Sequence, residues 1–179
     1  MITHKGKKID YIEHGEGPAI LFIPGSFSTP SAWSAVQKLM PSNYRFISTS
    51  LCGYGSTEEL RSTDNYGMQN LIDIIEAVVA KIGQPVHLVG HSFGGMVALA
   101  CALSDRFEIL SITTFEANPI TLIDACRHRH LFEETIKIKD EFEAAFNAQN
   151  KDAARIIIDF WGGDGSFASM PSSVQQYCR

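Results

Sequence analysis

Long apolar runs, paired cysteines and clustered basic residues are all missing from this 179-residue sequence. Without an apolar run of membrane-spanning length, we expect no membrane partner. The basic N-terminus is followed by no apolar segment, so we expect no secretory signal. The net charge of −5 argues against nucleic acid as the main partner, because phosphate binding needs clustered positive charge and the two basic runs, 5–8 and 127–129, are short.

Motifs that hold cofactors or metals are also missing. The four cysteines form no Cys-x-x-Cys pair, and none has a histidine at metal-ligand spacing. There is no phosphate loop and no dinucleotide fingerprint, so the sequence implies no cofactor and no metal. Free thiols suit a reducing compartment, and we therefore expect a cytoplasmic protein. Hydrophobic residues make up 45% of the sequence, enough for a domain with a real core.

From residue 19 to residue 115, strand patterns alternate with helix patterns. Short continuous apolar runs such as 19–23 and 86–89 are typical of strands buried on both faces of a sheet. The segment 65–82 carries an apolar stripe at helical spacing. The alternation predicts the α/β class, with a predominantly parallel, doubly wound sheet preceded by an N-terminal hairpin. The predicted strands are 8–14, 19–23, 44–48, 86–89 and 109–115, and the predicted helices are 31–40, 65–82 and 93–103.

The character of the sequence changes after Pro119. The run from about residue 121 to residue 160 is amphipathic at helical spacing, and the glycine cluster at 162–165 ends it. We therefore expect a sheet-containing core over residues 1–119 and a helical segment over residues 120–179.

The pentapeptide Gly90-His91-Ser92-Phe93-Gly94 joins a predicted strand to a predicted helix. The pattern Gly-x-Ser-x-Gly is weak by itself, but a serine on a sharp strand-to-helix turn projects its hydroxyl above the sheet. Glycines at 90 and 94 suit such a turn because neighbouring backbones crowd it. The following helix N-terminus favours developing negative charge. Ser92 is therefore the candidate nucleophile; the alternative is a glycine-rich packing turn with an incidental serine.

The stretch Val89–Gly95 resembles the nucleophile elbow of the α/β-hydrolase family, whose esterase- and lipase-like members use a serine nucleophile and carry a helical cap. The loop 22–28 is similar to the family's oxyanion loop, with Pro24 where many members have histidine. The resemblance implies that the backbone N–H groups of Ser26 and Phe93 form the oxyanion hole. It also implies a fold of α/β-hydrolase type in which the helical segment is the cap.

The stretch Leu51–Ser56 is similar to the family's glycine loop, which many members precede with aspartate. Ser50 stands at that position here, a departure that concerns loop anchoring more than chemistry. Dehalogenases and epoxide hydrolases of this family use aspartate as the nucleophile. Because this sequence has Ser92 at that position, the resemblance disfavours both of those chemistries.

A serine nucleophile needs a base, usually histidine, that is oriented by a carboxylate. The resemblance implies that complete relatives continue past the cap with two more strand–helix units, the last of which supplies that histidine. Because the sequence stops at Arg179, we expect it to be truncated before those units and impaired in activity. Glu116, at the end of a predicted strand, is the candidate acid, and a role as a loop anchor is equally open. Asp164 is a weaker candidate.

The remaining histidines are less suited to the role of base. His128 and His130 fall in the predicted cap, where a surface position is the commoner role. His91 is expected to pack within the elbow. His87 begins a buried strand, so we expect it to be packed or hydrogen-bonded.

The resemblance implies a hydrolase that acts on a small carboxylic ester, thioester or amide through Ser92, with a small-molecule substrate as its partner. The alternatives that stay open are a non-enzymatic module that binds a small ligand, an inactive fragment, and a C–C hydrolase, perhydrolase or lyase on the same fold. In a truncated chain, the strand 109–115 would form an apolar sheet edge. We therefore also expect this edge to pair with a second copy, giving a homo-oligomer, or with a missing C-terminal piece.

Overall fold

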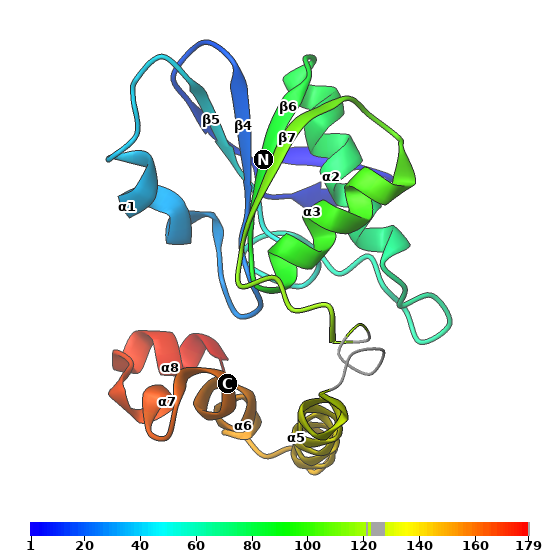
Figure 1. The fold of residues 1–179 in the computed structure, drawn as a ribbon, viewed down its shortest axis with the longest axis vertical. Helices are drawn as coiled ribbons and strands as arrows, with labels where there is room; N and C mark the ends of the chain where they lie inside the picture. Colours follow the sequence, from blue (N-terminus) through cyan, green and yellow to red (C-terminus); the bar gives the residue numbers. More distant parts are fainter. Residues whose placement is uncertain (121, 123–127, 179) are drawn as a thin grey trace. The chain divides into compact units, whose positions relative to one another are not determined.

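A five-stranded, mostly parallel sheet forms the centre of the first part of the chain (Figure 1). Its order is β3–β5–β4–β6–β7. The parallel strands are β4 (Ala19–Ile23), β5 (Arg45–Ser48), β6 (Val86–His91) and β7 (Ile109–Phe115), and β3 (Ile12–His14) pairs antiparallel with β5. The predicted α/β class and the mostly parallel sheet are confirmed.

The computed structural model describes residues 1–120, 122 and 128–178. It divides the chain into two units, Met1–Asn118 and Pro119–Arg179. The sheet and its helices belong to the first unit, and the second unit is helical.

The N-terminal hairpin consists of β1 (Ile2–His4) and β2 (Lys7–Ile9), which form a separate two-stranded antiparallel sheet. The prediction of one strand over residues 8–14 is wrong, because the chain leaves β2 and enters the large sheet only at β3. At the break, the Asp10 N–H donates to Oγ1 of Thr57 at 3.0 Å instead of to a neighbouring strand. A side chain from a distant loop therefore interrupts the strand.

Two helices cover one face of the sheet: α2 (Gln69–Ile82) and α3 (Phe93–Ser104). Their apolar side chains form the larger core with β4 and β6, as the helical stripe predicted. Helix α2 begins four residues later than predicted, because Asn65 forms a bridge with Ser62 and accepts a hydrogen bond from the Asn70 side chain. The fully buried members of this core include Leu21, Ile23, Ile74, Ile75, Val78, Leu88 and Val97.

The other face is covered over β4 and β5 by the 3₁₀ turn η1 (Pro30–Trp33) and the single-turn helix α1 (Ser34–Gln37). Trp33 packs there on Phe22, with ring centroids 5.2 Å apart. The predicted helix over 31–40 is shorter than expected, because its apolar residues do not share one buried face. Trp33 is buried, whereas Leu39 is 89% exposed.

Strand β7 lies at the edge of the sheet, and within the described residues no other strand pairs with its outer side. Leu110 and Phe115 on this strand are each 50% exposed, and Leu103 on neighbouring α3 is exposed as well. The edge is thus apolar, as expected. Its pairing with a second copy stays a prediction.

The second unit contains α5 (Arg129–Asn147), α6 (Ala153–Gly162), α7 (Ser166–Ser169) and α8 (Ser172–Cys178). The long helical run predicted from residue 121 includes 121 and 123–127, which lie outside the described residues. A turn at 148–152 divides the rest of that run into two helices. No helix in the described ranges combines the length and the apolar character needed to cross a membrane.

Candidate active site

Ser92 lies between the last residue of β6 and the first residue of α3, with φ 50° and ψ −121°. A positive φ costs a residue with a side chain about 1–2 kcal/mol, so the surroundings must hold it in place. The Ser92 N–H donates to the carbonyl of Phe115 at 2.8 Å, and the Ser92 carbonyl accepts from Gly95 N at 2.9 Å. The turn at Ser92 is therefore fixed by both β7 and α3.

The glycines of the elbow lie where backbones approach closely. A Cβ atom at Gly90 would lie 2.5 Å from the carbonyl oxygen of Gly94, and one at Gly94 would clash with the carbonyl oxygens of Ile23 and Pro24. Both glycines are buried. Because backbone atoms cannot move aside cheaply, any larger residue at either position would distort the turn that carries Ser92.

The loop after β4 lies directly against the elbow. A Cβ atom at Gly25 would lie 3.2 Å from Cβ of Ser92 and 3.1 Å from Nδ1 of His91. The next residue, Ser26, is exposed, and Phe93 opens α3. In the part of the chain that the structure describes, the N–H groups of Ser26 and Phe93 have no hydrogen-bond acceptor. An oxyanion hole requires donors without acceptors, so these two N–H groups stay candidates for it.

The Ser92 hydroxyl is partly exposed and has no hydrogen-bond partner among the described residues. A general base for a serine nucleophile must lie within hydrogen-bond reach of that hydroxyl. The structure thus places a partly exposed serine hydroxyl at the turn before α3, and it brings no described histidine ring into hydrogen-bond contact with Ser92 Oγ.

Glu116, the predicted acid, follows β7 directly and has φ 52°. Its carboxylate Oε2 lies 3.5 Å from Nε2 of His91, and the two side chains are 85% and 48% exposed. The prediction that His91 packs within the elbow is wrong. The ring lies at the C-terminal end of β6, beside Gly25, and it faces Glu116 instead of the core.

The other sequence candidates do not join this site in hydrogen-bond contact. A hydrogen bond of 2.8 Å joins Nδ1 of His87 to Oγ of Ser111, which confirms the expected hydrogen-bonded role. His128 and His130 are exposed at the start of α5, with ring centroids 6.2 Å apart. Asp164 is exposed between α6 and α7.

The loop after β5 is bonded to a residue that the sequence analysis missed. Asp10 Oδ2 accepts hydrogen bonds from Ser50 Oγ and from the Ser56 N–H, each at 2.8 Å. Asp10 therefore supplies a carboxylate beside the position where many family members carry aspartate. The only sequence signal was the departure at Ser50, because Asp10 is distant along the chain and lay inside a predicted strand.

Cysteine and metal chemistry find little support in the described part of the chain. It holds no cluster of three or more His, Cys, Asp or Glu residues placed to bind a metal ion. Cys52 and Cys101 are buried free thiols, and burial raises the pKa of the Cys101 thiol to about 12. A thiol with a raised pKa is a poor nucleophile. Cys126 lies outside the described residues.

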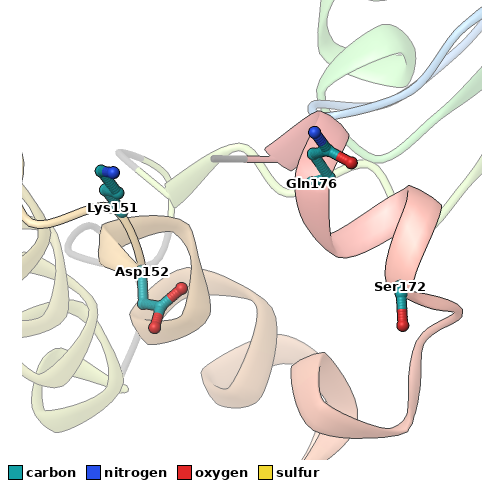
Figure 2. A pocket seen from close by; sticks show the side chains of 4 residues that line it. All are labelled: Lys151, Asp152, Ser172 and Gln176. Carbon is teal, nitrogen blue, oxygen red and sulfur yellow. The ribbon is translucent and has the colours of Figure 1, made fainter.

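The second unit has an open pocket of about 570 Å³ (Figure 2). Lys151 and Asp152 line it from the turn that precedes α6, and Ser172 and Gln176 line it from α8. The described residues that line it include neither histidine nor cysteine, and the sequence analysis did not point to it.

Comparison with known proteins identifies the relationship. The sequence matches the Alpha/beta hydrolase family over residues 20–174. A crystal structure of an alpha/beta hydrolase from Sphaerobacter thermophilus superimposes with a TM-score of 0.68 at 17% identity, covering 95% of this chain and 60% of that one. At that identity the likeness shows the fold alone.

Two relatives have named activities. The pimeloyl-(acyl-carrier protein) methyl ester esterase of Aeromonas salmonicida is 29% identical over 105 residues, which is 59% of this chain and 40% of the esterase. A fluoroacetate dehalogenase from a Burkholderia species is 28% identical over 115 residues, 62% of this chain and 38% of the dehalogenase. The chain spans roughly a third to two fifths of the length of the curated relatives that it matches.

Proposed function

The chain belongs to the alpha/beta hydrolase family, and on that premise we propose that it hydrolyses a small carboxylic ester, thioester or amide with Ser92 as the nucleophile. The observation that carries the proposal is the strained turn at Ser92, held by the Phe115 carbonyl and closed on one side by Gly25. Strain of this kind persists only where the surrounding fold maintains it, and it exposes a hydroxyl beside a helix N-terminus.

In the proposed reaction, Ser92 Oγ adds to the substrate carbonyl carbon and the carbonyl π electrons move to oxygen. The N–H groups of Ser26 and Phe93, with the N-terminus of α3, stabilise the oxyanion. Collapse of the tetrahedral intermediate expels the leaving group and leaves an acyl group on Ser92. Water then releases the acid and restores the hydroxyl.

A base must accept the Ser92 proton. We propose that the lack of a well-placed base limits the rate of hydrolysis by this chain. No described histidine bonds to the Ser92 hydroxyl. Serine hydrolases that lack a member of the triad retain only about 10³–10⁴-fold acceleration over water. Glu116 is proposed as the carboxylate of the site, because it follows the strand whose last carbonyl holds Ser92.

The remaining parts of the proposal concern the surroundings of the site. The helical segment 120–179 is proposed as the cap, on the basis of its resemblance to the cap of family members. A cytoplasmic location is proposed from the free thiols of Cys52, Cys101 and Cys178, since reducing compartments preserve them.

Ester chemistry is favoured over halide displacement within the family. The matched esterase is named for a methyl ester, and a neutral serine hydroxyl suits attack on a carbonyl carbon better than displacement at an alkyl carbon. The second candidate is a non-enzymatic module that binds a small apolar ligand. The Ser92 hydroxyl without a described partner favours it.

The test is hydrolysis of short-chain p-nitrophenyl esters, with fluoride release from fluoroacetate measured in parallel. We expect slow ester hydrolysis above the buffer rate in the wild type, none in Ser92→Ala, and no fluoride release in either. Ser104→Ala, on the same helix, is the matched control and is expected to behave as the wild type. Ester binding without hydrolysis, unchanged in Ser92→Ala, would favour the binding module.

A further inference from the structure

The loop after β5, here called the glycine loop (residues 50–57), is attached to the N-terminal segment through one carboxylate. Asp10 Oδ2 accepts from Ser50 Oγ at the start of this loop and from the Ser56 N–H near its end. The carboxylate therefore bridges both ends of the loop. Charge-assisted hydrogen bonds of this kind are stronger than bonds between neutral groups.

The backbone of the glycine loop packs directly against the Asp10 carboxylate. Gly55 has φ 57°, and a Cβ atom there would clash with Asp10 Oδ2 and lie 2.5 Å from Ser50 Oγ. Glycine therefore occupies this position both for its conformation and for the close approach.

The backbone of Asp10 is itself fixed by threonine side chains. Its N–H donates to Oγ1 of Thr57, and its carbonyl accepts from Oγ1 of Thr49 at 2.8 Å. Thr49 and Thr57 are buried. The backbone that carries the carboxylate is thus held by two buried side chains, one directly after β5 and one from the glycine loop itself.

The glycine loop contacts the loop that carries Ser26. The ring of Tyr54 meets the ring of Phe27 edge to face, with centroids 6.0 Å apart. Phe27 has φ 56°, a left-handed conformation that is unfavourable for a residue with a side chain. Such a conformation needs support from neighbouring groups, and an edge-to-face aromatic pair supplies favourable interaction of this kind.

We propose that Asp10 is a positioning residue for the oxyanion loop. Asp10 fixes the glycine loop, the glycine loop places Tyr54, and Tyr54 holds Phe27 in its left-handed conformation. Because Phe27 follows Ser26 directly, its conformation sets the direction of the oxyanion loop beside Ser92. The catalytic consequence rests on the proposed function, whereas the coupling from Asp10 to Phe27 does not.

The first readout is independent of activity. In the full chain, nuclear Overhauser contacts between the Tyr54 and Phe27 rings are expected to weaken strongly in Asp10→Ala. The matched control is Glu58→Gln, because Glu58 accepts a hydrogen bond from Lys8 N at 2.7 Å and so joins the same two segments away from Tyr54. That variant is expected to keep the contact. An unchanged contact in a folded Asp10→Ala protein would overturn the coupling.

The second readout is the rate at which a fluorophosphonate labels Ser92. A misplacement of about 1 Å in an active site can cost about 10²-fold in rate, so we expect Asp10→Ala to lower the maximal labelling rate 10- to 100-fold while half-saturation changes little. A general loss of folding would instead reduce the labelled fraction. The exchange Asp10→Ser with Ser50→Asp returns a carboxylate to the loop, and it is expected to recover most of the rate.

The two failures can be told apart. Loss of the ring contact with an unchanged labelling rate would overturn the positioning role. An unlabelled wild type would contradict the proposed function, and the ring contact would then decide the inference by itself. If Asp10→Ala does not fold, Asp10→Asn, which keeps the shape and removes the charge, takes its place in both measurements.

Discussion

The two sides of the candidate site are built in different ways. The nucleophile and oxyanion side depends on buried backbone, in which Gly25, Gly90 and Gly94 lie in contact with neighbouring main chain. The acid side consists of His91 and Glu116, whose side chains are largely exposed and 3.5 Å apart. Buried backbone contacts are not screened by salt. Exposed ion pairs are screened, and each contributes only about 0–1 kcal/mol to stability. The fold therefore specifies the nucleophile side much more strictly than the acid side.

The largest effect is expected from a substitution that disrupts the backbone packing around Ser92. Gly94→Ala would place a Cβ atom against two backbone carbonyls, which cannot move without shifting β4. We expect the free energy of unfolding to fall by about 3 kcal/mol or more, as for severe steric strain in a core. Urea denaturation would measure it. Gly67→Ala, at a glycine with open space around it, is the control and should change stability little.

Two substitutions of Ser26 distinguish the role of its backbone N–H from that of its side chain, and their expected effect is smaller. Ser26→Pro removes the N–H, and loss of one oxyanion donor typically lowers the rate by about 10²–10³-fold. Ser26→Ala keeps the N–H and is expected to react as the wild type does. Fluorophosphonate labelling rates would compare them. Equal rates for the two variants would remove Ser26 from the oxyanion hole.

The acid side should show a smaller change in reactivity and almost none in stability. Glu116→Gln is expected to lower the labelling rate by about tenfold if Glu116 supports the base, which is less than the roughly 10²–10⁴-fold effect of a general base itself. Its free energy of unfolding should change by less than about 0.5 kcal/mol, because the carboxylate is exposed. Glu108→Gln, at the exposed start of the same strand region, is the control. An unchanged rate would assign Glu116 to loop anchoring.

The smallest effect concerns the scaffold away from the site. Burial raises the pKa of Asp73, but hydrogen bonds from Lys5, Arg106 and Gln69 outweigh it and hold the pKa well below its usual range. A carboxyl with a lowered folded-state pKa stabilises the fold above its unfolded pKa of about 4 and loses that contribution as the pH falls below it. Asp73→Asn should therefore cost about 1 kcal/mol at pH 7, since Lys5 and Arg106 are partly exposed and screened.

This deficit should shrink as the pH is lowered from 4 toward 2, and labelling of Ser92 should be unaffected. Denaturation at several pH values would check the trend. A deficit that stays constant down to pH 2 would contradict the role assigned to the Asp73 hydrogen bonds.

The sequence predicted the features that depend on local pattern. Strand β7 has the predicted bounds because, apart from Ser111, its residues from 109 to 115 are all apolar or β-branched. The elbow was predicted because its glycines lie two residues before and two residues after Ser92 in the sequence. The α/β class followed from the alternation of strands and helices.

The features that depend on distant contacts were not predicted. The bond between Asp10 and Ser50 joins residues 40 positions apart, and no periodicity signals such a bond. The direction of His91 depends on the loop at Gly25, which packs beside it from another strand. The helix expected over 31–40 required Leu39 to be buried, which only the packing of the sheet could decide.

The central claim is that Ser92 is the nucleophile, and mapping of a fluorophosphonate adduct by peptide mass spectrometry tests it most directly. The account predicts one adduct, on the peptide that contains Ser92, in the wild type and in Ser104→Ala. It predicts none in Ser92→Ala. Equal labelling of wild type and Ser92→Ala, or an adduct on a different serine, would contradict the account.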